Sequence, residues 1–97
     1  MSEIALSEPI SSVADNTLIS AYLTGNEYAF EVLVSRYQDR LVNYLNRLIH
    51  DYEMSVDLSQ EAFIRVYRNA NRYQGQYKFS TWLYRIATNL AIDEMRR

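Results

Sequence analysis

The chain has 97 residues, enough for one domain with a single modest core and too few for two. Hydrophobic residues make up 48% and charged residues 23%, a globular composition that argues against intrinsic disorder. Without cysteine and with a single histidine, the sequence offers no disulfide framework and no thiolate metal site, so we expect no metal and no cofactor. A net charge of −2 argues against a generally basic nucleic-acid-binding protein.

Glycine and proline are scarce, which favours an all-α fold. The chain has two glycines, and its one proline, Pro9, lies near the N-terminus. Residues 1–14 lack periodicity and are expected to form a flexible tail, leaving residues 15–97 as the domain. No signal peptide and no stretch of roughly 18–20 apolar residues is present, so we expect a cytoplasmic protein without membrane insertion.

Two helices are expected in the first half of the domain. Asp15 or Asn16 can cap a short helix that ends at Gly25, where a left-handed residue is favoured. Asn26 can cap a second helix, roughly over residues 27–50, whose apolar residues recur at three- and four-residue steps. The core positions expected on this second helix are Phe30, Leu33, Val34, Tyr37, Leu41, Tyr44, Leu45 and Leu48.

A third helix, roughly over residues 53–72, carries an outer stripe whose charge changes sign along its length. The polar and acidic part contains Glu53, Asp57, Gln60 and Glu61, and the basic part contains Arg65, Arg68 and Arg72. This order suits the helix dipole, and Glu61–Arg65 is a favourable i,i+4 pair, so a purely structural role explains it well. Leu58 and Ile64, expected at the edge of the stripe and within it, favour instead a partner with basic residues around an apolar contact.

A loop centred on Gly75 joins this helix to the last one and is rich in aromatic residues. Tyr73, Tyr77 and Trp82 flank it, among the cations Arg72, Lys78 and Arg85. Unpaired bases stack on aromatic rings while their phosphates pair with arginine and lysine, so this combination suits single-stranded nucleic acid. The alternative is that these tyrosines fill the core of a small domain.

The last helix, expected within residues 78–97, is amphipathic. Its apolar side holds Phe79, Leu83, Ile86, Ala87 and Leu90. The opposite side mixes cations, amides, hydroxyls and the only tryptophan, at Lys78, Thr81, Trp82, Arg85, Thr88, Asn89, Asp93 and Arg96. We therefore expect a compact bundle of about four helices with a reading surface for something planar and negatively charged.

Three stretches of the sequence carry a family resemblance. They are the run from Asp57 to Arg68 (DLSQEAFIRVYR), the tripeptide YQG that begins at Tyr73, and the run from Lys78 to Arg97 (KFSTWLYRIATNLAIDEMRR). Together they resemble region 2 of bacterial sigma factors, in the extracytoplasmic-function (ECF) branch. The upstream run from Ala29 to Tyr37 is similar to that branch as well.

The resemblance implies an all-α domain that binds the RNA polymerase core and recognises and melts the minus-ten promoter element. Asp57, Gln60 and Glu61 match positions that meet the clamp helices of the largest polymerase subunit, with Ile64 and Arg65 beside them. Tyr73 and the loop to Lys78 match the segment that holds a base flipped from the non-template strand, and Trp82, Arg85 and Asn89 match positions that face the promoter. The full set expected to bind DNA is Arg65, Arg68, Arg72, Tyr73, Tyr77, Lys78, Thr81, Trp82, Arg85 and Asn89.

The resemblance also implies a partner and an absent domain. Sigma factors of this branch are commonly held by anti-sigma factors that cover the same surfaces. The second domain of such proteins, which reads the minus-thirty-five element, is expected to be absent from this chain.

Other classes of function are weighed against this interpretation. The sequence contains no glycine-rich phosphate loop, nucleophile elbow or paired carboxylates, so we expect no enzyme. A helical protein-interaction domain, or a regulator bound by an anti-sigma factor without direct DNA reading, is the main alternative. A helix-turn-helix repressor is disfavoured because the Gly75 loop exceeds the usual turn of about 3–4 residues.

Overall fold

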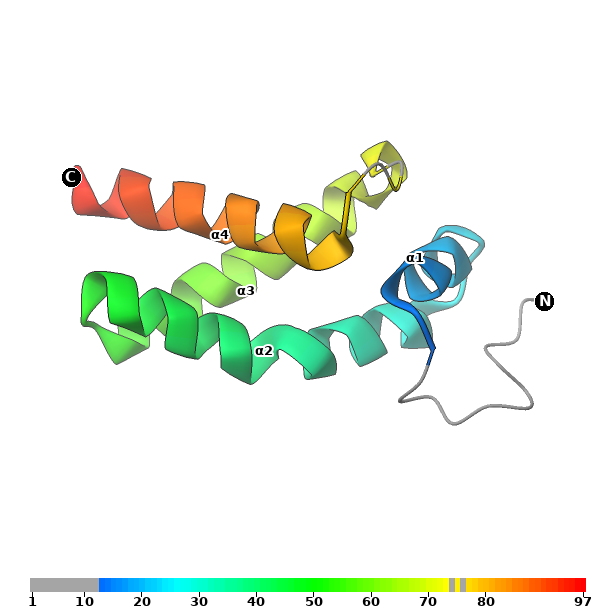
Figure 1. Ribbon diagram of the computed structural model, residues 1–97, viewed down its shortest axis with the longest axis horizontal. Helices are drawn as coiled ribbons and strands as arrows, with labels where there is room; N and C mark the ends of the chain where they lie inside the picture. The colour runs from blue at the N-terminus through cyan, green and yellow to red at the C-terminus, as the bar shows by residue number, and fades with distance from the viewer. Residues whose placement is uncertain (1–12, 74, 76) are drawn as a thin grey trace.

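The computed structural model describes residues 13–73, 75 and 77–97, and within them the chain forms four α-helices (Figure 1). They are α1 (Asp15–Leu23), α2 (Glu27–Ile49), α3 (Tyr52–Asn69) and α4 (Phe79–Met95), with a 3-10 turn, η2 (Ala70–Arg72), after α3. The described residues contain no strand. The expected all-α bundle of four helices is therefore confirmed.

The longest helix, α2, contacts all three other helices, so it organises the bundle. In Figure 1, α2 runs along the lower edge, α4 crosses above it, and α3 links them, while α1 lies at the end where α2 begins. The α1 helix also contacts η2, which leads into the turn around Gly75. The start of the domain and the turn between α3 and α4 are thereby neighbours.

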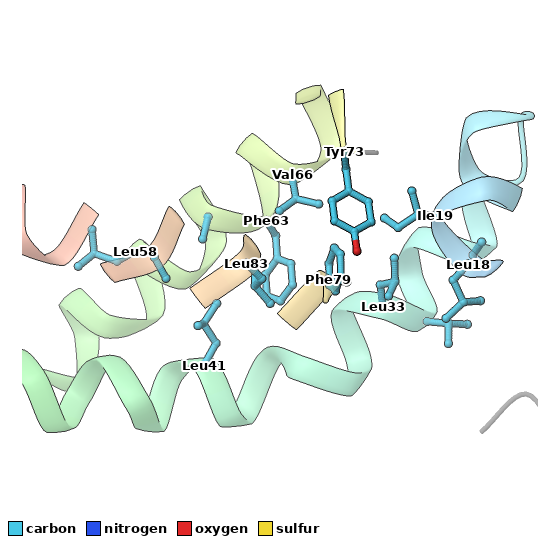
Figure 2. Packing of buried hydrophobic residues seen from close by; sticks show 14 of the residues in the cluster. Leu18, Ile19, Leu33, Leu41, Leu58, Phe63, Val66, Tyr73, Phe79 and Leu83 are labelled. Carbon is cyan, nitrogen blue, oxygen red and sulfur yellow. The ribbon is translucent and has the colours of Figure 1, made fainter. Parts of the chain in front are cut away.

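The core lies between α2, α3 and α4 and extends to α1 (Figure 2). Its fully buried side chains include Leu18, Leu33, Leu41, Phe79 and Leu83. Each such side chain contributes about 1.5–3 kcal/mol to folding through removal of apolar surface from water. Tyr44 and Thr88 add a 2.7 Å hydrogen bond between their hydroxyls that joins α2 to α4.

The ends of α2 follow the local sequence. The Asn26 side chain accepts a hydrogen bond from the Ala29 amide at 3.3 Å, as expected for a helix cap. Gly25, just before it, has a φ of +107°, the left-handed region that glycine occupies without strain. At the other end His50 takes the left-handed conformation, and Asp51 caps α3 through the Met54 amide at 3.0 Å.

The expected cap of α1 is wrong. Neither Asp15 nor Asn16 caps the helix; Ala14 precedes it and makes no side-chain capping bond. Asp15 instead forms an ion pair with Arg36 at 2.8 Å and accepts a hydrogen bond from the Tyr37 hydroxyl. Tertiary partners on α2 thus displace the local capping bond, which is worth only about 1 kcal/mol.

Two apolar positions also differ from the sequence-based expectation. Leu58, expected beside the charged stripe of α3, is buried in the core, and Leu48, expected in the core, is exposed. The expected tail over residues 1–14 lies outside the described residues as far as residue 12, and Val13 is buried in the core cluster.

Within the described part of the chain, no helix is both long and apolar enough to cross a bilayer. The same residues contain no group of three or more histidine, cysteine, aspartate or glutamate side chains that could hold a metal ion.

Candidate nucleic-acid interface

The basic end of α3 and the polar face of α4 meet in one shallow depression of about 430 Å³. It is lined by Arg65, Asn69, Arg72, Tyr77, Trp82, Ile86 and Asn89. These residues comprise two cations, two aromatic rings, two amides and one aliphatic side chain, and none of them is acidic. Five of the seven are residues that the sequence predicted to bind DNA.

Helical periodicity explains why these side chains converge. Arg65, Asn69 and Arg72 follow one another at steps of four and three residues, and Trp82, Ile86 and Asn89 repeat the same steps on α4. Residues at such steps share one face of a helix. Asn69 was missed by the sequence analysis, although its spacing from Arg65 was sufficient to find it, and Ile86, expected on the apolar side of the last helix, packs against the core and also lines the depression.

Tyr77 faces the depression and also contacts Arg85. The guanidinium of Arg85 lies 5.2 Å from the centre of the Tyr77 ring, a cation–π contact. Lys78 precedes α4 and Thr81 lies in its first turn, and both side chains are exposed. The residues Lys78, Thr81 and Arg85 are therefore not part of the lining of the depression, although Arg85 contacts Tyr77, which is.

Tyr73 occupies a different place from the one expected of a base-stacking residue. Its side chain is buried, with 9% exposed, and its ring stacks on Trp82 with centroids 5.1 Å apart and planes 14° apart. Figure 2 shows the ring pointing inward, toward the part of the core that holds Phe79 and Ile19. The open stacking face expected for Tyr73 is thus absent, because Trp82 and the core already cover the ring.

The Tyr73 hydroxyl is held by two acceptors. Its single proton is shared between the Asn16 side-chain oxygen of α1, at 3.0 Å, and the backbone carbonyl of Tyr77. Burial, followed by the nearby charges of Asp15 and Tyr77, raises the pKa of Tyr73 above its usual value near 10. The phenol therefore keeps its proton at neutral pH and remains a donor.

The acidic part of α3 forms a separate exposed surface. Asp57, Gln60 and Ile64 are exposed, with 41% of Ile64 accessible, and Glu61 pairs with Arg65 at 3.2 Å. Arg68, expected to bind DNA, lies on this side instead. It lines a second depression with Phe30, Phe63, Ile64 and Tyr67, apart from the depression between α3 and α4.

The depression combines arginines, aromatic rings and amides. Cations beside aromatic rings are typical of proteins that bind single-stranded nucleic acid. The family model for sigma-70 region 2 matches residues 33–97, and the chain belongs to this family.

The chain is similar to several curated relatives and to solved structures. It is 40% identical over 81 residues to RNA polymerase sigma-H factor of Pseudomonas aeruginosa, covering 84% of this chain and 42% of that protein. It is 44% identical over 73 residues to ECF RNA polymerase sigma factor SigW of Bacillus subtilis, covering 75% and 39% respectively. For ECF RNA polymerase sigma-E factor of Escherichia coli the identity is 38% over 79 residues, covering 81% and 41%.

Among the solved structures that the chain resembles is an engineered region 2 of sigma-E in complex with GTAAAA, determined by NMR. It matches with a TM-score of 0.78 and 36% identity, covering 98% of this chain and 90% of that chain. The chain spans about two fifths of the length of the curated relatives, 39–42% for the three named above.

Proposed function

We propose that this chain is the promoter-recognition domain of an ECF sigma factor. It captures the non-template strand of an opened minus-ten element in the depression between α3 and α4, and it binds the RNA polymerase core through the outer face of α3. The observation that carries the proposal is the lining of that depression, with two arginines, two aromatic rings and two amides. The family's solved complex with GTAAAA supports it.

Each group in the depression has a distinct task in this proposal. Arg65 and Arg72 pair with phosphates, which positions the strand without reading its sequence. Tyr77 and the accessible part of Trp82 stack on unpaired bases, a contact worth about 1–3 kcal/mol per base. The amides of Asn69 and Asn89 can both donate and accept, so they discriminate between base edges.

These contacts favour the open promoter over the closed duplex. A base that is paired and stacked in a duplex cannot reach Tyr77 or Trp82, so the stacking energy is available only after the strand is opened. Binding therefore shifts the equilibrium of a bubble that polymerase forms, and the domain itself needs no catalytic group.

The outer face of α3 supplies the polymerase contact. Asp57, Gln60 and Glu61 present polar and acidic groups around the exposed Ile64. This arrangement complements basic clamp helices with an apolar contact at the centre. An anti-sigma factor covering the same face would compete with polymerase, and we expect the domain to act in the cytoplasm, where it would meet polymerase.

Glu61→Lys tests the polymerase contact. The Glu61–Arg65 pair is exposed, so its loss costs the fold only about 0.3–0.5 kcal/mol, and the circular dichroism melt should stay nearly unchanged. Affinity for a fragment of the polymerase clamp should fall by about tenfold or more because charge complementarity is reversed. A variant that unfolds, or that binds the clamp as tightly as the wild type, contradicts the assignment.

Strand capture is tested by fluorescence anisotropy with labelled GTAAAA as a single strand and as a duplex, at several salt concentrations. We expect the single strand to bind more tightly, and equal affinity for both forms would refute the stacking model.

Asn89→Ala and Trp82→Ala should weaken single-strand binding. The matched control Asn43→Ala, which removes the same amide from an exposed site on α2, should not.

A further inference from the structure

The turn between α3 and α4 is held from behind by α1. Tyr73 is the link, because its hydroxyl bonds to Asn16 of α1 and to the carbonyl of Tyr77 at the far side of the turn. Its ring meanwhile stacks on Trp82, the tryptophan that lines the depression. One buried side chain thus joins α1, the turn and the proposed reading surface.

Tyr73 supports the reading surface without belonging to it. Only 9% of the residue is exposed, and Trp82 covers one face of its ring. Because offset or parallel aromatic pairs favour a defined geometry, the position of Tyr73 limits the positions that Trp82 can take. A shift of Tyr73 would therefore move both Trp82 and the Tyr77 backbone.

Asn16 is well placed to prevent that shift. Its amide oxygen lies 3.0 Å from the Tyr73 hydroxyl, and its amide nitrogen lies 3.7 Å from the point where a β-carbon at Gly75 would stand. Gly75 has a φ of +75°, which side-chain-bearing residues rarely adopt. Asn16 accordingly bonds to the turn at Tyr73, and its amide lies near Gly75.

The first turn of α1 is itself anchored to α2. Asp15, the neighbour of Asn16, pairs with Arg36 at 2.8 Å and accepts a hydrogen bond from Tyr37. The α1 helix also contacts α2 along its length and packs against η2. Asn16 therefore projects toward the turn from an element whose position is already determined by the bundle.

We propose that Asn16, acting through Tyr73, is a positioning residue that holds Trp82 and Tyr77 in the geometry that binds the extruded strand. This inference rests on the strand-capturing function proposed above. It assigns to α1, which lies outside the depression, a part in base recognition. Asn16 then influences strand affinity without lining the depression.

The experiment uses Asn16→Ala, Tyr73→Phe, the double variant and the control Asn43→Ala, all in the 97-residue chain. Tyr73→Phe keeps the ring that stacks on Trp82 and removes the hydroxyl that bonds to Asn16 and Tyr77. Affinity for single-stranded GTAAAA should fall roughly fivefold in Asn16→Ala, the size expected from one lost hydrogen bond, and at least as much in Tyr73→Phe, which also loses the bond to Tyr77. Because both act through the same bond, the double variant should lose no more than Tyr73→Phe alone.

A spectroscopic measurement separates positioning from a general loss of stability. Trp82 is the only tryptophan in the chain, so its fluorescence reports directly on the stacked pair. The comparison is made without nucleic acid and in variants that keep the helix content of the wild type. Acrylamide should quench the fluorescence of Trp82 more strongly in Asn16→Ala than in the wild type or in Asn43→Ala. Either unchanged quenching or unchanged GTAAAA binding in Asn16→Ala would overturn the inference, as would losses that add in the double variant.

Failure of the underlying function gives a different result. If the wild type binds single-stranded GTAAAA no better than duplex, the strand-capturing function is refuted, and with it the role of Asn16 in recognition. If the wild type prefers the single strand and Asn16→Ala binds it equally well, the function stands and the inference alone is refuted.

Discussion

Tyrosine hydroxyls make many of the side-chain links between elements in this small domain. The partners joined in this way are Tyr22 with Tyr67, Tyr37 with Asp15, Tyr44 with Thr88, Tyr67 with Glu27 and Tyr73 with Asn16. A phenol suits this use because its ring packs against the core while its hydroxyl reaches a polar partner at the edge. These rings, including that of Tyr73, which was expected to stack on a base, are therefore held within the fold.

One of these links predicts a pH dependence. Burial and the hydrogen bond to Asp15 raise the pKa of Tyr37 to about 12. The folded state therefore holds this proton more tightly than the unfolded state, whose tyrosine titrates near 10. The stability from Tyr37 is complete below about pH 10 and is lost as the pH rises toward 12.

Tyr37→Phe tests this link. It should lower the free energy of unfolding by about 2 kcal/mol at neutral pH, the range for a hydrogen bond to a charged group. The difference from the wild type should narrow above about pH 10, measured by urea unfolding at a series of pH values. If the difference in free energy of unfolding between the wild type and Tyr37→Phe stays constant up to pH 12, this assignment is contradicted.

Burial separates two aliphatic residues of similar size. Leu83 is fully buried whereas 41% of Ile64 is exposed. Leu83→Ala should destabilise the domain by about 2–5 kcal/mol, because it removes apolar contacts and leaves a cavity. Ile64→Ala should change stability by no more than about 0.5 kcal/mol. Thermal melts of both variants check the contrast, and similar melting temperatures would contradict it.

At the scale of the element, α3 divides its surface among three environments. Ala62, Phe63 and Val66 face the core, while Arg65 and Asn69, followed by Arg72 of η2, line the depression. Ile64 and Arg68 lie on the remaining side. Since each residue turns the helix by about 100°, a shift of one residue is enough to move a cation from one surface to another.

The end of α2 offers a stabilising change. His50 has a φ of 57° and a ψ of 41°, a left-handed conformation that costs energy for any residue with a β-carbon. His50→Gly should raise the free energy of unfolding by about 0.5–1 kcal/mol, because glycine adopts this conformation freely. Chemical unfolding measures the effect. His50→Ala is the matched control and should bring no gain, since alanine retains the β-carbon.

At the scale of the whole molecule, local charge outweighs net charge. The chain carries a net charge of −2, yet the depression is lined by Arg65 and Arg72 and by no acidic residue. Acids gather instead toward the N-terminal part of α3, at Glu53, Asp57 and Glu61. A domain of slightly acidic composition can therefore present a cationic surface to one partner and an acidic surface to another.

This arrangement predicts a modest salt dependence of strand binding. Each phosphate contact to a single strand contributes about −0.7 to the slope of the logarithm of affinity against that of salt. Arg72→Gln should make the slope shallower by about 0.7 in anisotropy titrations. Arg47→Gln, an exposed cation at the far end of α2, should leave it unchanged. A slope that Arg72→Gln does not alter would exclude a phosphate contact at this residue.

Much of this organisation follows from the sequence alone. Helix content follows from periodicity and from the scarcity of glycine and proline, and Asn26 and Gly25 mark the boundary between α1 and α2. The grouping of Arg65, Arg72, Tyr77, Trp82 and Asn89 in one depression was anticipated as well. The helices and their boundaries rest on interactions between residues close in the chain, which the order of residues specifies directly, whereas the grouping in the depression was anticipated from the charge and aromatic pattern and from the family resemblance.

The tertiary structure decided what depends on distant partners. Leu58 is buried in the core, and Asp15 binds Arg36 and Tyr37 in place of capping α1. Arg68 lines a different depression from Arg65 and Arg72. The tertiary structure also buried Tyr73 by bringing Asn16, 57 positions away, to its hydroxyl. A helical pattern states which face a residue occupies, but which face another element covers is settled only when the helices pack.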